Sequence, residues 1–138
     1  APSLRAAVEQ GIFGTVGTEF RSAPARPGVE IEFLPATTDP GKIICIGVNY
    51  RSHQQETGRA AHQAEQKAPT IFTRFADPQM GPLQPAQMPA TTSEFDYEGE
   101  MALVIGRDAW HVAEEDAFGY VAGYGAYNDF SVRDWQLA

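Results

Sequence analysis

Residues 96–105 read Asp-Tyr-Glu-Gly-Glu-Met-Ala-Leu-Val-Ile, so that three acids at alternate positions lead directly into an apolar run. Side chains two positions apart on a β-strand point to the same face, and we therefore expect Asp96, Glu98 and Glu100 to lie together. Neighbouring carboxylates repel each other, and burying one without a compensating partner is costly. A divalent cation with oxygen ligands would compensate them, so the stretch predicts a metal site; a solvated acidic face is the alternative.

The composition is that of a globular domain with an acidic balance. The 138 residues are a usual length for one domain, and 43% of them are hydrophobic. The net charge of −8 argues against nucleic acid and anionic membranes as partners, and no apolar run is long enough to span a bilayer. The single cysteine, Cys45, lies in an apolar run, so we expect it to pack in the core of a cytoplasmic protein.

Strand-forming segments dominate the chain after residue 41. Residues 1–41 are rich in Gly and Pro beyond a short helix over 4–10, and we interpret them as an N-terminal appendage. Apolar and β-branched runs predict strands, whereas an acidic first turn predicts a short helix. The expected elements are strands over 42–50, 70–75, 94–106 and 121–132, an extended connection over 77–89, a helix over 113–120, and a helix or loop over 51–67. This pattern indicates a β-rich α+β fold.

Asp129 interrupts a predicted strand between Tyr127 and Phe130. A lone Asp in this place equally suits the start of a turn. As a third carboxylate across the sheet from Glu98 and Glu100, it would complete a three-oxygen platform whose remaining positions are filled by water and substrate. The spacing of an EF-hand is absent, and the lack of a Cys pair or a close His pair disfavours zinc. An all-oxygen set predicts Mg²⁺ or Mn²⁺, with Ca²⁺ as a further option.

Two further polar pairs are candidates for a functional role. His53 and Glu56 are neighbours on a helical turn, where a carboxylate orients an imidazole as a general base requires. The His-x-x-Glu pattern is weak, and by spacing alone an exposed pair without a role is the simpler interpretation. Arg133 lies four positions after Asp129, and its guanidinium suits bidentate recognition of a carboxylate. A surface ion pair of Arg133 with Asp134 or another acid is the alternative.

Taken in order, these motifs resemble the catalytic domain of the fumarylacetoacetate hydrolase family. The resemblance extends from residue 40 to residue 137, and several motifs in the family's order make it specific. The segments that carry it are 42–53, 69–72, 96–106, 121–124 and 128–136. The resemblance implies a mixed-sheet β-roll, of which residues 42–138 would form the N-terminal part, and it implies a homodimer.

The resemblance also implies a metal centre. Members of the family bind Mg²⁺ or Mn²⁺ through the two Glu of a Glu-x-Glu motif and one downstream Asp. In this sequence those positions are Glu98, Glu100 and Asp129.

Four other positions match residues that act on the substrate in the family. A His–Glu dyad acts on water or substrate, and here it is His53 and Glu56. An Arg and a Gln help to hold the substrate, and here they are Arg133 and Gln136. Known activities of the family are hydrolysis of carbon–carbon bonds in acylpyruvates, decarboxylation or isomerisation of related 2-oxo acids, and lyase reactions.

One departure concerns a Lys that follows the Asp-x-x-x-Arg region in the family and is absent here. We therefore expect the sequence to be a piece of a longer protein. For the intact protein we hypothesise metal-dependent hydrolysis of a carbon–carbon bond in a 2,4-dioxo acid of the acylpyruvate or fumarylpyruvate type. The alternatives are a decarboxylase or isomerase of a 2-oxo or 2-hydroxydienoate acid in aromatic catabolism, a lyase such as ureidoglycolate lyase, and a non-catalytic metal-binding scaffold.

Overall fold

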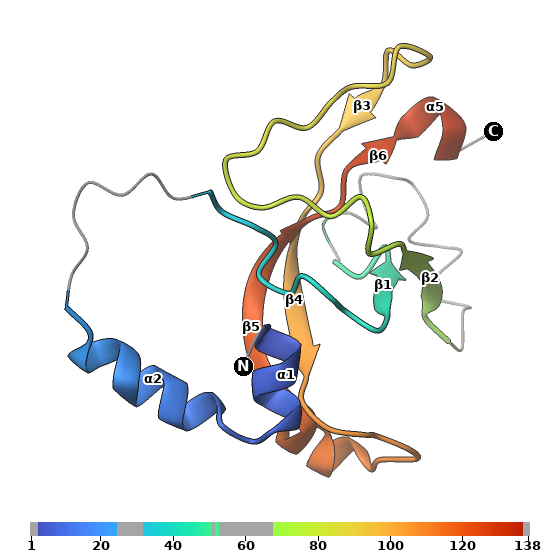
Figure 1. Cartoon of the computed structure of the whole chain (residues 1–138). Coiled ribbons are helices and arrows are strands. Elements are labelled where there is room, and N and C mark those ends of the chain that lie inside the picture. The colour runs from blue at the N-terminus through green and yellow to red at the C-terminus, as the bar shows by residue number, and fades with distance from the viewer. Residues whose placement is uncertain (1–2, 25–31, 51, 53–67, 137–138) are drawn as a thin grey trace.

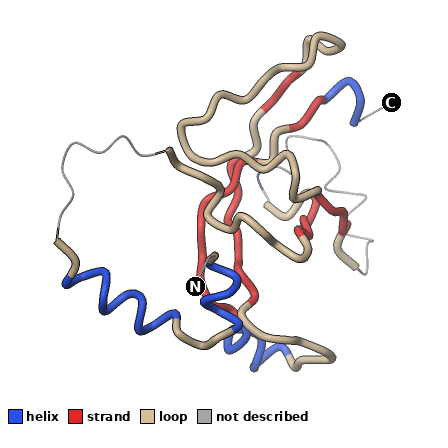
Figure 2. Tube along the Cα trace, in the orientation of Figure 1, coloured by secondary structure: helices blue, strands red, loops and turns tan. Residues whose placement is uncertain are grey.

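The computed structural model describes residues 3–24, 32–50, 52 and 68–136 of the chain (Figure 1). Three antiparallel strand pairs form the β part of the structure, and helices lie around them (Figure 2). The elements are α1 (Leu4–Glu9), α2 (Phe13–Ser22), β1 (Ile43–Gly47), β2 (Thr70–Arg74), β3 (Phe95–Asp96), β4 (Gly99–Ile105), the 3₁₀ helix η1 (Glu114–Tyr120), β5 (Val121–Asn128), β6 (Ser131–Val132) and α5 (Arg133–Gln136).

The β4–β5 hairpin is the longest strand pair in the described part of the chain. Its register sets Glu100 opposite Tyr127 and Leu103 opposite Tyr124. Burial alternates along β4, because residues two apart share a face: the face with Glu100 is half-buried, whereas Leu103 lies on the exposed face. The acid that begins the apolar run therefore points to the inner side of the hairpin.

Gly106 allows the chain to leave β4 close to the start of β5. Its N–H donates to the carbonyl of Tyr120 at 2.8 Å. A Cβ at this position would lie 2.7 Å from the Cβ of Ala122, closer than two carbons can approach. The tight crossing coincides with a shift of register between Val104 and Ile105.

The β3–β6 pair extends the β4–β5 hairpin into one interrupted ribbon (Figure 1). Asp96 of β3 lies opposite Ser131 of β6. Between the two pairs, the N–H of Asp129 donates to the carbonyl of Glu98 at 2.9 Å. Side chains at such an interruption are freed from regular alternation, and two of the predicted acids, Glu98 and Asp129, lie there.

The β1–β2 pair contributes the buried thiol of Cys45 and an arginine at its end, Arg74. Cys45 lies opposite Phe72, and Ile43 lies opposite Arg74 at the open end. Cys45 and Ala7 are the buried hydrophobic residues among those that the structure describes. The expected core position of Cys45 is therefore observed.

The N-terminal residues form two helices where the sequence predicted one. Ser3 caps α1 by accepting the N–H of Ala6 at 3.2 Å, and Gly11 after the helix adopts φ +65°. The second helix, α2, was predicted as loop because Gly14 and Gly17 lower helix propensity.

The β-rich α+β class is confirmed, and one detail of the strand prediction is wrong. The strands expected over 94–106 and 121–132 are each divided in two, because the ladder breaks between β3–β6 and β4–β5. The short helix expected over 113–120 is observed, as the 3₁₀ helix η1. The described helices include none with the length and apolar character that crossing a membrane requires. The boundary at residue 41 stays a prediction.

Candidate functional site

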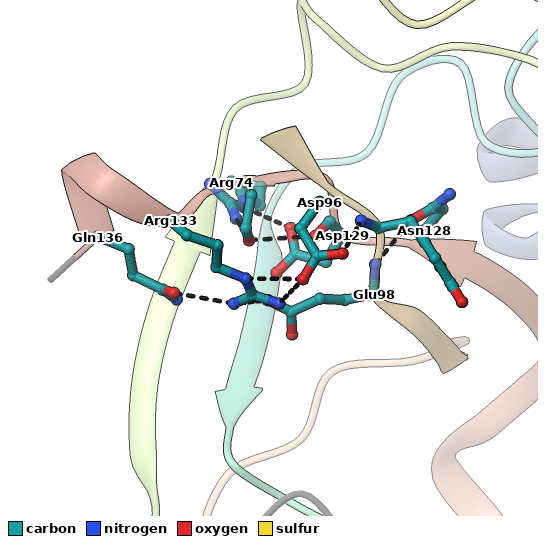
Figure 3. Close-up of polar contacts among 9 residues, drawn as sticks. Arg74, Asp96, Glu98, Asn128, Asp129, Arg133 and Gln136 are labelled. Carbon is teal, nitrogen blue, oxygen red and sulfur yellow. Dashed lines mark hydrogen bonds and ion pairs between the residues drawn. The ribbon is translucent and has the colours of Figure 1, made fainter. Parts of the chain in front are cut away.

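The interruption of the ribbon brings Glu98 and Asp129 side by side. Besides the bond between their backbones, the side chain of Asn128 accepts the N–H of Glu98 at 3.0 Å. Both acids are thus held by main-chain contacts, which do not depend on the charges of the side chains. Figure 3 shows the acids and the arginines that meet there.

Asp129 is a buried carboxylate that is neutralised by Arg74. Its side chain is only 4% exposed, and Arg74 Nε donates to Oδ1 at 2.6 Å. The hydrogen bond to Asp129 is the main cause that raises the pKa of Arg74, against the opposing effect of burial. The guanidinium also lies over the ring of Phe72, 5.3 Å from its centroid.

Arg133, at the start of α5, contacts a second group of polar side chains (Figure 3). Its Nη1 lies 2.6 Å from Glu98 Oε1 and its Nη2 lies 2.8 Å from Asp96 Oδ2. Nη1 also donates to Gln136 Oε1 at 2.9 Å. Burial alone would lower the pKa of Arg133, but the bonds and charges of Asp96 and Glu98 outweigh it and raise that pKa. The N–H of Arg133 is fixed to the carbonyl of Glu94 at 2.8 Å.

Glu100 lies two residues beyond Glu98, on the half-buried face of β4 opposite Tyr127. Its charge reaches the same region: burial is the main cause that raises the pKa of the Cys45 thiol, followed by the charges of Asp129 and Glu100. Among the described residues, however, no three His, Cys, Asp or Glu side chains are arranged as a set that holds a metal. The structure places Glu100 on β4, whereas Glu98 and Asp129 lie at the break between the strand pairs, where they contact Arg133 and Arg74.

The ligand atoms that the three acids offer are of the kind that a divalent cation binds. Glu98, Glu100 and Asp129 offer carboxylate oxygens, the ligands that Mg²⁺ and Mn²⁺ prefer. Positive charge already compensates this cluster, through Arg133 on Glu98 and Arg74 on Asp129. A cation at this position would share those carboxylates with the arginines or take their place.

The structure thus unites four of the predicted residues, Glu98, Asp129, Arg133 and Gln136, in the described part of the chain. The alternative of an ion pair between Arg133 and another acid is what the structure shows, since Arg133 pairs with Asp96 and Glu98. Its neighbour Asp134 instead accepts the hydroxyl of Thr92 at 2.7 Å. His53 and Glu56 lie outside the described residues.

Arg74 is the site residue that the sequence analysis missed. It is the charged end of the strand Thr-Ile-Phe-Thr-Arg and falls on the same face as Phe72. A charged residue on the inner face of a strand requires a partner, and this was the signal available in the sequence.

Residues 42–138 match the sequence model of the family described as "Fumarylacetoacetate (FAA) hydrolase C-terminal". The chain belongs to the fumarylacetoacetate hydrolase family. A relative in this family, the fumarylacetoacetate hydrolase domain-containing protein 2 homolog of Dictyostelium discoideum, is 46% identical over 75% of this chain and 33% of its own length. The mitochondrial oxaloacetate tautomerase Fahd2a of Rattus norvegicus is 39% identical over 83% of this chain and 35% of its own length.

Solved structures of the family share the fold. A putative HpcE protein from Mycobacterium smegmatis superposes with a TM-score of 0.77 at 28% identity, covering 100% of this chain and 47% of that one. The fumarylacetoacetate hydrolase of Exiguobacterium antarcticum superposes with a TM-score of 0.67 at 31% identity, covering 84% and 41%. The chain spans about a third of the length of the two curated relatives named above.

Proposed function

We propose that the protein of which this chain is a part is a Mg²⁺- or Mn²⁺-dependent enzyme that promotes enol chemistry of a small 2-oxo acid. The observation that supports it is the meeting of Glu98 and Asp129 at the break in the ribbon, with Arg133 beside them. A cluster of oxygen ligands next to a guanidinium suits a substrate that combines a chelating 2-oxo acid with a further carboxylate. When bound, the cation would supply Lewis-acid stabilisation of the enolate charge.

The residues of the chain would hold the substrate and move its proton. The planar guanidinium of Arg133 offers parallel N–H donors that match a carboxylate. It would replace some of its bonds to Asp96 and Glu98 with bonds to the substrate carboxylate, and Gln136 lies beside it. His53, which the family resemblance pairs with Glu56, would take or give the proton at carbon or at water.

Two reactions share this arrangement. Hydrolysis of a carbon–carbon bond in a 2,4-dioxo acid of the acylpyruvate type adds an attacking water, whereas isomerisation needs proton transfer alone. Isomerisation gains support from a relative that is 39% identical to this chain and is named an oxaloacetate tautomerase. We therefore propose keto–enol isomerisation of a 2-oxo dicarboxylic acid alongside hydrolysis. We further propose a homodimer and a cytoplasmic location, although that relative's name places it in mitochondria.

The test uses the full-length protein, stripped of metal and then supplied with Mg²⁺, Mn²⁺ or Ca²⁺. Oxaloacetate enolisation, acylpyruvate cleavage and ureidoglycolate breakdown are followed in parallel. We expect metal-dependent turnover of a 2-oxo acid that is lost in Glu98→Gln, Glu100→Gln and Asp129→Asn, and retained in Glu115→Gln, an exposed acid of η1. Cleavage of ureidoglycolate alone would indicate a lyase, and metal binding without any turnover would indicate a scaffold.

A further inference from the structure

Asp129 differs from the other acids of the site because its carboxylate is buried and solvent cannot stabilise its negative charge. Its side chain is 4% exposed, whereas that of Glu98 is 21% exposed. A buried carboxylate needs a fixed cation or several hydrogen bonds to remain in place. Among the described residues, the Arg74 guanidinium supplies this charge, with Nε 2.6 Å from Oδ1.

Arg74 is itself held in a defined orientation. Its side chain packs over Phe72, and its Nη2 makes a long contact of 3.5 Å with Ser131 Oγ. The same hydroxyl donates to the carbonyl of Asp129 at 3.2 Å. Arg74, Asp129 and Ser131 thus form a ring of contacts that links the end of β2 to the break in the ribbon. Figure 3 shows the contact between Arg74 and Asp129.

We propose that Arg74 is a positioning residue, which fixes the Asp129 carboxylate in the orientation that a divalent cation requires. The inference rests on the proposed function, since it concerns a ligand of the proposed metal. A carboxylate has two oxygens and about four acceptor sites, so the bond from Nε to Oδ1 leaves capacity for a cation on the same group. Partners that orient a metal ligand from behind typically change metal affinity by about 10- to 100-fold when removed.

A structural role and a positioning role predict different results. If Arg74 served only the stability of the fold, its loss would lower the unfolding midpoint and leave the Mn²⁺ affinity of the folded protein unchanged. If Arg74 competed with the metal for Asp129, its loss would raise that affinity. Positioning alone predicts a loss of affinity in a protein that is still folded.

The experiment measures Mn²⁺ binding by electron paramagnetic resonance in full-length wild-type, Arg74→Met and Arg74→Lys proteins. The matched control is Arg5→Met, which removes an arginine whose Nε bonds a carboxylate, that of Glu9, at 2.8 Å on the exposed surface. Circular dichroism checks that each variant is folded. We expect Arg74→Met to bind Mn²⁺ about 10- to 100-fold more weakly, Arg74→Lys to recover part of the loss, and Arg5→Met to match the wild type.

The possible outcomes separate this inference from the proposed function. Wild-type protein that binds no Mn²⁺ would overturn the proposed metal site and, with it, the role of Arg74. Wild-type binding with equal or tighter binding in Arg74→Met would overturn the positioning role alone. If Arg74→Met does not fold, Arg74→Lys decides: several-fold weaker binding supports the inference, and unchanged binding overturns it.

Discussion

The ion pair between Arg74 and Asp129 makes an asymmetric prediction about stability. The two partners differ in burial, since the arginine side chain is 35% exposed and the aspartate side chain is 4% exposed. Removing either one breaks the same 2.6 Å contact, but the group left behind differs. Without Asp129, the guanidinium of Arg74 can be hydrated by solvent. Without Arg74, the carboxylate of Asp129 remains buried and unpaired.

The magnitudes follow from that difference. Arg74→Met preserves much of the packing on Phe72 but leaves an uncompensated buried charge, and breaking buried pairs in this way costs about 3 kcal/mol or more. Asp129→Asn keeps an acceptor oxygen for an arginine that solvent reaches, and we expect a cost of about 1 kcal/mol. The expected difference between the two variants is therefore about 2 kcal/mol of unfolding free energy.

Urea unfolding of the full-length protein in the presence of a chelator measures both values without a contribution from metal. The control is Arg5→Met, whose pair with Glu9 is exposed at both partners and should contribute less than about 0.5 kcal/mol. Equal losses in the two site variants, or a larger loss in Asp129→Asn, would show that burial of the carboxylate does not control the energetics.

Three other predictions concern separate parts of the chain. His53→Ala should abolish most turnover and leave Mn²⁺ affinity unchanged, because a general base need not be a ligand; wild-type turnover would remove the assignment. Thr92→Val should lower the unfolding free energy by about 1 to 3 kcal/mol, since its buried hydroxyl donates to Asp134. The exposed neighbour Thr91→Val serves as control in urea unfolding, where equal midpoints would contradict the prediction. Burial and nearby carboxylates raise the pKa of Cys45, so iodoacetamide should modify it more slowly in the folded than in the urea-unfolded protein, as mass spectrometry would show. Similar alkylation rates in the folded and the unfolded protein would refute this prediction. Because the pKa of Cys45 is higher in the folded state, the protonated thiol contributes stability below the ordinary value of 9.0, and this stability is lost as the pH rises through the folded-state pKa.

Local features of the fold followed closely from the sequence. The strands expected over 42–50 and 70–75 correspond to β1 and β2, because apolar and β-branched runs specify strands through their immediate neighbours. The division of the strand over 94–106 was not predictable in the same way. It depends on where the partner strand ends its pairing, and that partner lies about thirty residues away.

The sequence by itself determined the family and placed the acids, because the Glu-x-Glu motif and the segments around it are read from consecutive residues. Only the tertiary structure decided which arginine meets which acid. Arg133 lies 37 positions from Asp96, and Arg74 lies 55 positions from Asp129. Contacts over such separations depend on strand register and on the break in the ribbon, neither of which leaves a pattern in the sequence around either partner.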